Sequence, residues 1–258
     1  MLSITAPAGI THVLGINTEY KTGVVFNSAY CILPGGEVTS RYDKQHLLSF
    51  IEKPISGMIM PFFSSEGFSA ISDTSHAAPL NTPYGKAGVF ICNEASVPAA
   101  AASMVKQGAI FFLNMSNDGW FNDTYIVRTH FYYARLRAVE SRKDLAVNTN
   151  NGYSGLIKAS GEIVEQERSE DAFVKIVSIQ PNNLVTTAAI LPNWFVFSCL
   201  AFLLFNAIIG LIKKIKQLQP DTATGWGKHV LTHEWTPWRD ETACPDSVPG
   251  PRARTDRC

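Results

Sequence analysis

The sequence lacks the cysteine patterns that hold small secreted domains or structural metal ions together. It has no Cys-x-x-Cys pair, and the histidines and cysteines of its C-terminal segment fit no common zinc-site spacing: His229, His233, Cys244 and Cys258. An odd and scattered set of five cysteines argues against a disulfide framework but leaves the redox compartment open. We therefore expect no disulfide scaffold, no metal site and no cofactor.

The sequence also has no excess of charge of either sign. Lysine plus arginine number 22 and aspartate plus glutamate number 22, so the formal net charge is zero. A nucleic-acid-binding surface needs a basic excess on one face, and none is expected here. Residues 1–4 do not start a signal peptide, because no basic region leads into a long apolar run.

Charge is missing altogether from residues 194–212, where Ser198 and Asn206 cannot form the polar stripe of a soluble helix. About 20 apolar residues are enough to span a bilayer, so we predict one transmembrane helix over residues 188–212. Three lysines follow it directly, and by the positive-inside rule that end is cytoplasmic. The preceding domain then lies on the outer side of the membrane. Residues 213–258, which have no hydrophobic period, are expected to be a disordered cytoplasmic tail.

The rest of the sequence alternates between apolar runs and one clear amphipathic segment, which is typical of the α/β class. Residues 129–142 place apolar and charged side chains on opposite faces and predict a helix. Strands are expected at residues 11–16, 24–33, 88–92, 108–113, 144–148 and 155–159. Several of these runs have no polar break, which indicates a sheet buried on both faces.

Cys92 follows the apolar run 88–91 and precedes a segment that begins at Pro98 and has the composition of a helix. A thiol at the end of a strand can be exposed, and backbone N–H groups of a following helix can stabilise a thiolate or a developing oxyanion. Cys92 is thus a candidate nucleophile, although free cysteine is more often a small and inert core residue.

Two further features upstream have both a functional and an ordinary interpretation. Lys44 lies among apolar residues, where it is either a fixed positive charge in a pocket or a solvated side chain with a buried stem. Residues 53–80 mix proline, glycine, serine and methionine without a period, and they predict a long loop. Such a loop is either a functional lid or a loosely packed insertion.

Five pieces of the sequence form an ordered set across residues 10–165: residues 26–29 (FNSA), 42–47 (YDKQHL) with Phe50 and Glu52, 92–94 (CNE), 114–121 (NMSNDGWF) and 135–140 (RLRAVE). Each piece alone is a weak signal, but the ordered set is specific. Taken together, the pieces resemble the nitrilase superfamily, the carbon–nitrogen hydrolases. Within it, they look like the extracytoplasmic domain of the bacterial apolipoprotein N-acyltransferase family.

The resemblance implies a nitrilase-like α/β/β/α sandwich over residues 1–183 and a Glu-Lys-Cys triad. Cys92 would be the nucleophile, and Lys44 would stabilise the tetrahedral oxyanion. Glu52 and Glu94 match accessory carboxylates, for which the alternative is a buried structural ion pair with Lys44. Trp120 and Asn27 match substrate-binding positions, and for Trp120 a core aromatic is the alternative.

The same resemblance implies an acyl transfer between two lipid substrates. A fatty acyl chain would pass from a phospholipid to Cys92 as a thioester, and then to the N-terminal amine of a diacylglyceryl-cysteine apolipoprotein. The implied location is the bacterial inner membrane, with the catalytic domain on the periplasmic side. A membrane-tethered nitrilase-type amidase and a non-catalytic truncated product are the alternatives.

The sequence departs from the family pattern in several places. The catalytic glutamate of the family lies on a strand upstream of residues 15–16, and neither that strand nor the family's earlier membrane helices are found here. Asn93 stands where the acyltransferases commonly carry an aromatic residue, and the tail after Lys216 resembles nothing in the family. These departures predict a C-terminal fragment or a truncated gene product that is inactive, or nearly so, on its own.

Overall fold

The computed structural model describes residues 9–21, 24–48, 52, 73–121, 124–168 and 171–218. The chain divides into two compact units, Met1–Phe202 and Leu203–Cys258. The first unit carries all of the sheet structure described below, and the boundary between the units falls within a long C-terminal helix.

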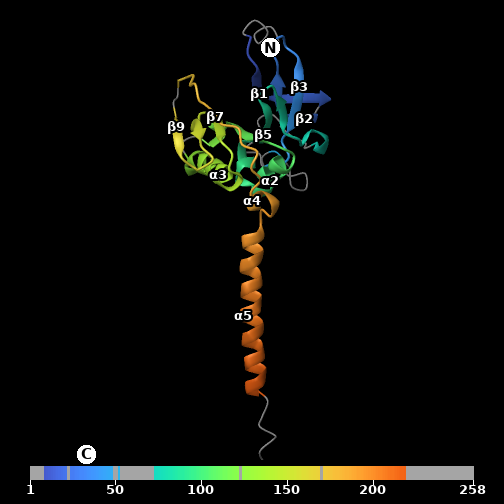
Figure 1. Cartoon of the computed structure of the whole chain (residues 1–258), viewed down its shortest axis with the longest axis vertical. Coiled ribbons are helices and arrows are strands. Elements are labelled where there is room, and N and C mark those ends of the chain that lie inside the picture. The colour runs from blue at the N-terminus through green and yellow to red at the C-terminus, as the bar shows by residue number, and fades with distance from the viewer. Residues whose placement is uncertain are drawn as a thin grey trace, which may run out of the picture. The chain divides into compact units, whose positions relative to one another are not determined.

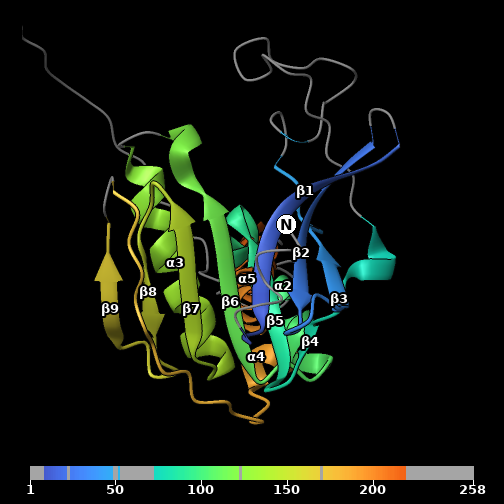
Figure 2. The same cartoon turned by 90° about the horizontal axis from the view of Figure 1, so that it is seen from above.

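The N-terminal strands form an antiparallel sheet of three in the order β1-β2-β3 (Figure 2). The strands are β1 (His12–Lys21), β2 (Val24–Ile32) and β3 (Val38–Asp43). The strands predicted at residues 11–16 and 24–33 are therefore present. β1 is longer than predicted because it pairs with β2 as far as the partners Lys21 and Val24, so that polar residues beyond residue 16 are held by the ladder.

The second sheet has six strands in sequence order, and its centre is parallel. β5 (Gly85–Ile91), β6 (Phe111–Asn117) and β7 (Leu145–Asn150) run parallel, whereas β4 (Leu80–Thr82), β8 (Ser154–Ile157) and β9 (Ile163–Glu167) add antiparallel edges. β6 continues past the predicted end at residue 113, because its polar residues up to Asn117 still pair with β7.

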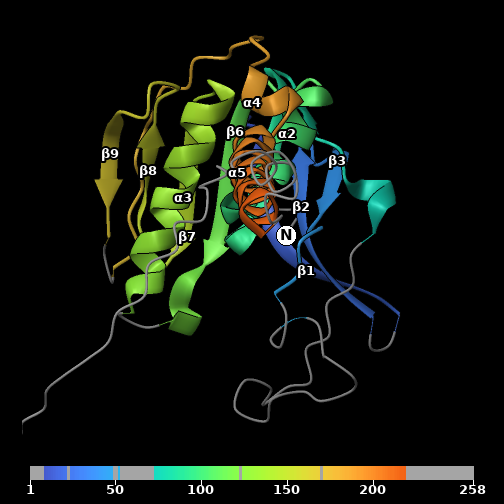
Figure 3. The ribbon, with the colours of Figure 1, turned by 90° about the horizontal axis from the view of Figure 1, so that it is seen from below.

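Helices α2 (Pro98–Lys106) and α3 (Tyr125–Ser141) cover one face of the six-stranded sheet, and the three-stranded sheet lies on the other (Figures 2 and 3). One core joins the three layers: Ala29 and Tyr42 from the small sheet, Phe90 and Phe112 from the large sheet, and Phe131 from α3 are all buried. Helix, sheet and sheet are three layers of the predicted sandwich, and the predicted α/β fold class is confirmed.

Short 3-10 helices fill three connections between these elements. They are η2 (Thr74–His76), η3 (Cys92–Ser96) and η4 (Asp118–Phe121). η3 separates Cys92 from the start of α2 at Pro98, so the N–H groups next to the thiol belong to η3 and not to α2.

The C-terminal segment contains two helices, α4 (Thr187–Ile190) and α5 (Trp194–Leu218) (Figure 1). Pro192 lies between them and cannot donate a backbone hydrogen bond, which explains why the predicted single helix from residue 188 is interrupted. α5 also continues beyond the predicted end at residue 212, because lysine and glutamine are good helix formers. Residues Trp194–Gln217 are long and apolar enough to cross a membrane. Residues 219–258 of the predicted tail lie outside the described residues.

Candidate active site

Cys92 stands at the carboxyl edge of the parallel strands. It follows β5 directly, and its φ of 57° is in the left-handed region, which a residue with a side chain rarely adopts. Ile91 pairs with Met115 of β6, so Cys92 and Ser116 lie beside each other where the two strands end. The half-buried thiol is thus held on a sharp turn at the edge of the sheet, where functional residues of parallel sheets gather.

Opposing influences act on the ionisation of this thiol. Burial is the largest, and it raises the pKa of Cys92. The positive charge of Lys44 and a hydrogen bond with Ser116 lower the pKa, while the negative charges of Asp118 and Glu52 raise it. Lys44 follows β3 of the small sheet, so the packing of one sheet on the other brings its ammonium within electrostatic reach of the thiol.

Lys44 is almost fully buried, at 1% exposure, and is held by Glu52. Its Nζ donates to both carboxylate oxygens of Glu52, at 2.9 Å and 2.7 Å. The backbone N–H of Leu48 and the side-chain amide of Asn27 also donate to Glu52, at 2.7 Å and 3.4 Å. Asn27 therefore helps to hold the Glu52 carboxylate, which in turn holds Lys44, and this ion pair compensates for the burial of the ammonium.

Glu94 lies two residues after Cys92 and is fully buried, but it contacts hydrogen-bond donors instead of Lys44. Its Oε1 accepts from the Tyr42 hydroxyl at 2.8 Å and from the backbone N–H groups of Gln45 and His46 at 2.7 Å and 3.0 Å. Its Oε2 accepts from Ile91 N–H at 2.9 Å. Burial raises the pKa of Glu94, and these donors oppose that shift. Glu94 thus ties the backbone after Lys44 to the strand before Cys92.

Three polar residues next to the thiol were not assigned a role from the sequence. Ligand atoms of Cys92, Asp118 and His130 all lie within 4.8 Å of one another. Asp118 Oδ1 accepts from the Ser116 hydroxyl at 2.6 Å and contacts His130 Nδ1 at 3.0 Å. Asp118 and Ser116 belong to the quoted segment 114–121, where their position after an apolar strand was a usable signal. His130 lies on α3, and only the packing of α3 on η3 reveals it.

Other predicted features are only partly described. Trp120 lies within η4, but its side chain is outside the described residues. Residues 53–72 of the proposed lid are also outside them, as are the C-terminal histidines and cysteines. The described residues thus bring together a thiol, a buried cation and a carboxylate–imidazole pair. Such a set of groups is suited to covalent catalysis on a carbonyl group.

Comparison with known proteins agrees with this arrangement. Residues 1–189 match the carbon–nitrogen hydrolase family. The chain is similar to the apolipoprotein N-acyltransferase of Geobacter metallireducens, with 32% identity over 139 residues that cover 53% of this chain and 27% of the relative. It is also similar to that of Agrobacterium fabrum, with 37% identity over 147 residues that cover 54% and 27%. The chain spans about a third or less of the length of these relatives.

Solved structures share the fold at low sequence identity. A carbon–nitrogen hydrolase from Helicobacter pylori G27 superposes with a TM-score of 0.55 at 18% identity, covering 66% of this chain and 62% of that one. Nit3 of Saccharomyces cerevisiae, a member of the nitrilase superfamily, superposes with a TM-score of 0.51 at 22% identity, covering 65% and 59%. Since the family match extends over well over half of its residues, the chain belongs to the carbon–nitrogen hydrolase family.

Proposed function

We propose that this chain carries the acyl-transfer site of an apolipoprotein N-acyltransferase, with Cys92 as its nucleophile. The observation that carries the proposal is a thiol on a strained turn at the edge of the sheet, where the buried ammonium of Lys44 opposes the rise in pKa that burial causes. The similarity to named N-acyltransferases supports the choice of reaction. The candidate membrane helix supports lipid substrates, because it would hold the site where both are found.

The reaction proceeds in two steps through a thioester. The Cys92 thiolate attacks the carbonyl carbon of a phospholipid ester, the ester C–O bond breaks, and the lysophospholipid leaves with a proton on its oxygen. The N-terminal amine of a diacylglyceryl-cysteine apolipoprotein then attacks the thioester carbon. The C–S bond breaks, an amide forms, and the proton lost by the amine returns to the sulfur. A covalent intermediate divides one difficult transfer into two easier ones.

Lys44 stabilises the negative oxygen that forms in both tetrahedral intermediates. Its charge is held by Glu52 at 2.7 Å and needs no reorganisation when the oxyanion develops. Glu94 has a positioning role, because its hydrogen bonds hold the backbone next to Lys44 and the backbone before Cys92 in one arrangement. Asn27 acts through Glu52, and Trp120 is assigned to the acyl site by resemblance alone.

Neither Glu52 nor Glu94 is free to take the thiol proton, since Lys44 occupies the first and four donors occupy the second. Loss of a general base typically costs about 100- to 10,000-fold in rate. The Asp118–His130 pair is the described alternative beside the thiol. If it does not act as the base either, the 258-residue chain should form the thioester at least about 100-fold more slowly than a protein that supplies the base. Such a protein is a chimera in which this chain replaces the matching part of the Geobacter relative.

The experiment incubates the chimera with phosphatidylethanolamine vesicles and analyses the Cys92 peptide by mass spectrometry. The expected result is an added acyl mass on Cys92 that disappears when a synthetic diacylglyceryl-cysteine peptide is added. A matched chimera with Cys92→Ala should show neither the adduct nor the N-acylated peptide, whereas Cys31→Ala should show both. A folded chimera that hydrolyses small amides without any acyl adduct would identify an amidase instead, and one that does neither would identify a non-catalytic chain.

A further inference from the structure

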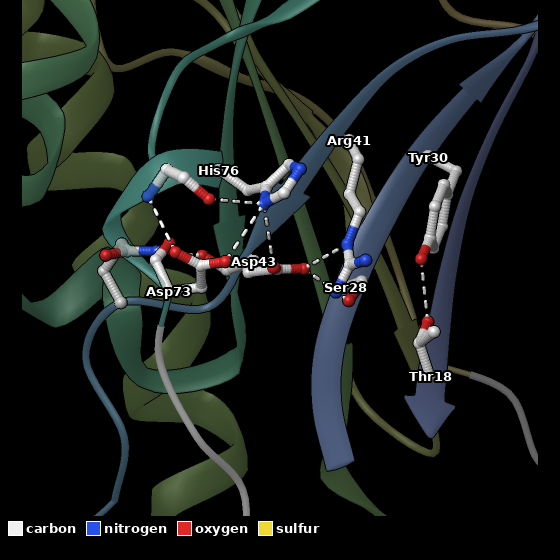
Figure 4. A network of polar contacts seen from close by, with 9 residues as sticks. Thr18, Ser28, Tyr30, Arg41, Asp43, Asp73 and His76 are labelled. Atoms are coloured by element: carbon white, nitrogen blue, oxygen red, sulfur yellow. Dashed lines mark hydrogen bonds and ion pairs between the residues drawn. The ribbon is translucent and has the colours of Figure 1, made fainter. Parts of the chain in front are cut away.

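A second polar cluster lies at the end of β3, outside the proposed acyl-transfer site. Ligand atoms of Asp43, Asp73 and His76 all lie within 4.8 Å of one another. Figure 4 shows the imidazole of His76 between the two carboxylates, with His76 and Asp73 coming from the η2 segment and Asp43 from β3. Asp73 caps η2 and lies three residues before His76, whereas Asp43 is 30 residues upstream of Asp73, so the fold brings Asp43 to the other two.

Each carboxylate in this cluster uses one oxygen for the protein and turns the other toward His76. Asp43 Oδ1 accepts from the Ser28 hydroxyl at 2.6 Å and from Arg41 Nε at 2.7 Å. Asp43 Oδ2 accepts no hydrogen bond from any described residue, although the side chain is fully buried. Asp73 Oδ1 likewise accepts from the Ser75 N–H at 2.8 Å, which leaves Oδ2 for the cluster.

The distances within the cluster suit one metal ion. His76 Nδ1 lies 3.6 Å from Asp43 Oδ2 and 3.4 Å from Asp73 Oδ2. Ligand atoms at about 2.0–2.2 Å from a tetrahedral zinc ion are roughly 3.3–3.6 Å apart, and both His76 distances lie in this range. The two carboxylate oxygens lie within 4.8 Å of each other. A buried carboxylate oxygen without a donor is costly, and a cation would satisfy it.

Neighbouring side chains hold the three proposed ligands in place and leave the cluster accessible to solvent. The side-chain amide of Gln45 donates to the backbone oxygens of both Asp43 and Asp73, at 2.6 Å and 2.9 Å, and so joins the two segments that supply the carboxylates. Ser28 and Arg41 orient the Asp43 carboxylate in the way that outer groups orient metal ligands. His76 and Asp73 are each 40% exposed, so solvent can reach the cluster and supply a remaining ligand.

We propose that Asp43, Asp73 and His76 bind a divalent transition-metal ion, with Zn²⁺ as its best match, and that the ion ties η2 to the end of β3. One imidazole and two carboxylates form a ligand set that zinc accepts in proteins. The proposal is independent of the acyl-transfer reaction.

The test uses the full chain in detergent micelles, treated under native conditions with N-ethylmaleimide so that accessible thiols do not compete for metal. Zn²⁺ binding is measured by calorimetry in the wild type, Asp73→Asn and His76→Gln. Each variant should lose one bound ion or bind it at least about tenfold more weakly, because it removes a ligand. His130→Gln is the matched control and should bind as the wild type does. At a free concentration about 100 times the wild-type dissociation constant, Zn²⁺ should raise the wild-type melting temperature by roughly 5–10 °C and that of either variant by at most about half as much.

Both variants remove partly exposed side chains, so they are expected to fold, and circular dichroism with a chelator present checks this. Binding that is equal in the wild type, Asp73→Asn and His76→Gln would overturn the proposal. So would a loss in His130→Gln with retention in His76→Gln, because the ion would then lie at Cys92 and Asp118. If the wild type binds no Zn²⁺, the proposal is wrong, and His76 contacts the two carboxylates only by hydrogen bonds or ion pairs.

Discussion

The central pair at the scale of single residues is the Lys44 ammonium and the Cys92 thiol. Because the charge of Lys44 lowers the pKa of Cys92, its removal should raise that pKa, and the thiolate should appear only at higher pH. We predict that Lys44→Met shifts the midpoint of Cys92 alkylation by iodoacetamide to higher pH, as followed by mass spectrometry of the Cys92 peptide. It should also destabilise the fold by about 3–5 kcal/mol, because Glu52 keeps a buried charge without its partner.

Lys86→Met is the control for that experiment, since Lys86 is exposed and donates to the backbone oxygen of Gln107. An unfolded Lys44→Met protein would react as an ordinary exposed thiol, so protease resistance must be shown at each pH. An unchanged midpoint in the folded variant would mean that Lys44 does not act on Cys92, and the role proposed for it in catalysis would lose its basis.

The sequence identified site residues well where a reactive side chain directly follows a predicted strand. It identified them poorly where residues of different elements meet only through packing. Cys92 could be singled out because an apolar run stops at it. Lys44 was a candidate from its apolar surroundings, and the resemblance supplied its role and that of Glu52. The ion pair between them is shown only by the structure. The sequence could not place His130 beside Cys92 and Asp118, or His76 beside Asp43, because these partners come from other elements.

At the scale of elements, the hairpin of β8 and β9 depends on a close approach of two backbones. A Cβ added at Gly155 of β8 would collide with the backbone oxygen of Glu165 in β9. Backbone cannot move aside as a flexible side chain can, so we predict that Gly155→Ala destabilises the chain by about 1–3 kcal/mol, measured by urea unfolding. Gly15→Ala in β1 is the control, because its added Cβ would meet only Met115 at an ordinary 3.7 Å. Equal stability of the two variants would contradict the expected clash.

The positions of strands and helices could be predicted from the sequence wherever the pattern of apolar residues was clear. β2 lies close to its predicted range because it is a largely apolar run buried on both faces. α3 begins at Tyr125, before its predicted start at residue 129, and its buried residues share one face. The end of β6 was placed too early, since its last residues are polar and are kept in the strand by the ladder with β7. The edge strands β4 and β9 also escaped prediction, because β4 has only three residues and β9 alternates without a strongly apolar face.

At the scale of the whole molecule, the membrane topology must account for both the carbon–nitrogen hydrolase domain and the candidate membrane helix that follows it. α5 ends in a lysine-rich turn with Lys213, Lys214 and Lys216, whereas its first residue is Trp194, an amphipathic side chain common at membrane interfaces. If the lysines remain inside the cell, the carbon–nitrogen hydrolase domain faces outward. Phospholipid and lipoprotein substrates of the outer leaflet would then be available to it.

This topology predicts the behaviour of reporters fused after Leu218. Green fluorescent protein should be fluorescent there, and alkaline phosphatase inactive, because the first folds in the cytoplasm and the second needs an oxidising compartment. Replacing all three lysines by glutamine should lower the fluorescence at least about twofold, since loops within a few residues of a span set its orientation through their positive charge. Replacing the exposed Lys86, Lys106 and Lys175 of the domain in the same way should change nothing, because these residues are distant from the span along the chain. Active phosphatase and dark fluorescent protein after Leu218 would place the domain inside the cell, away from the lipid substrates proposed for it.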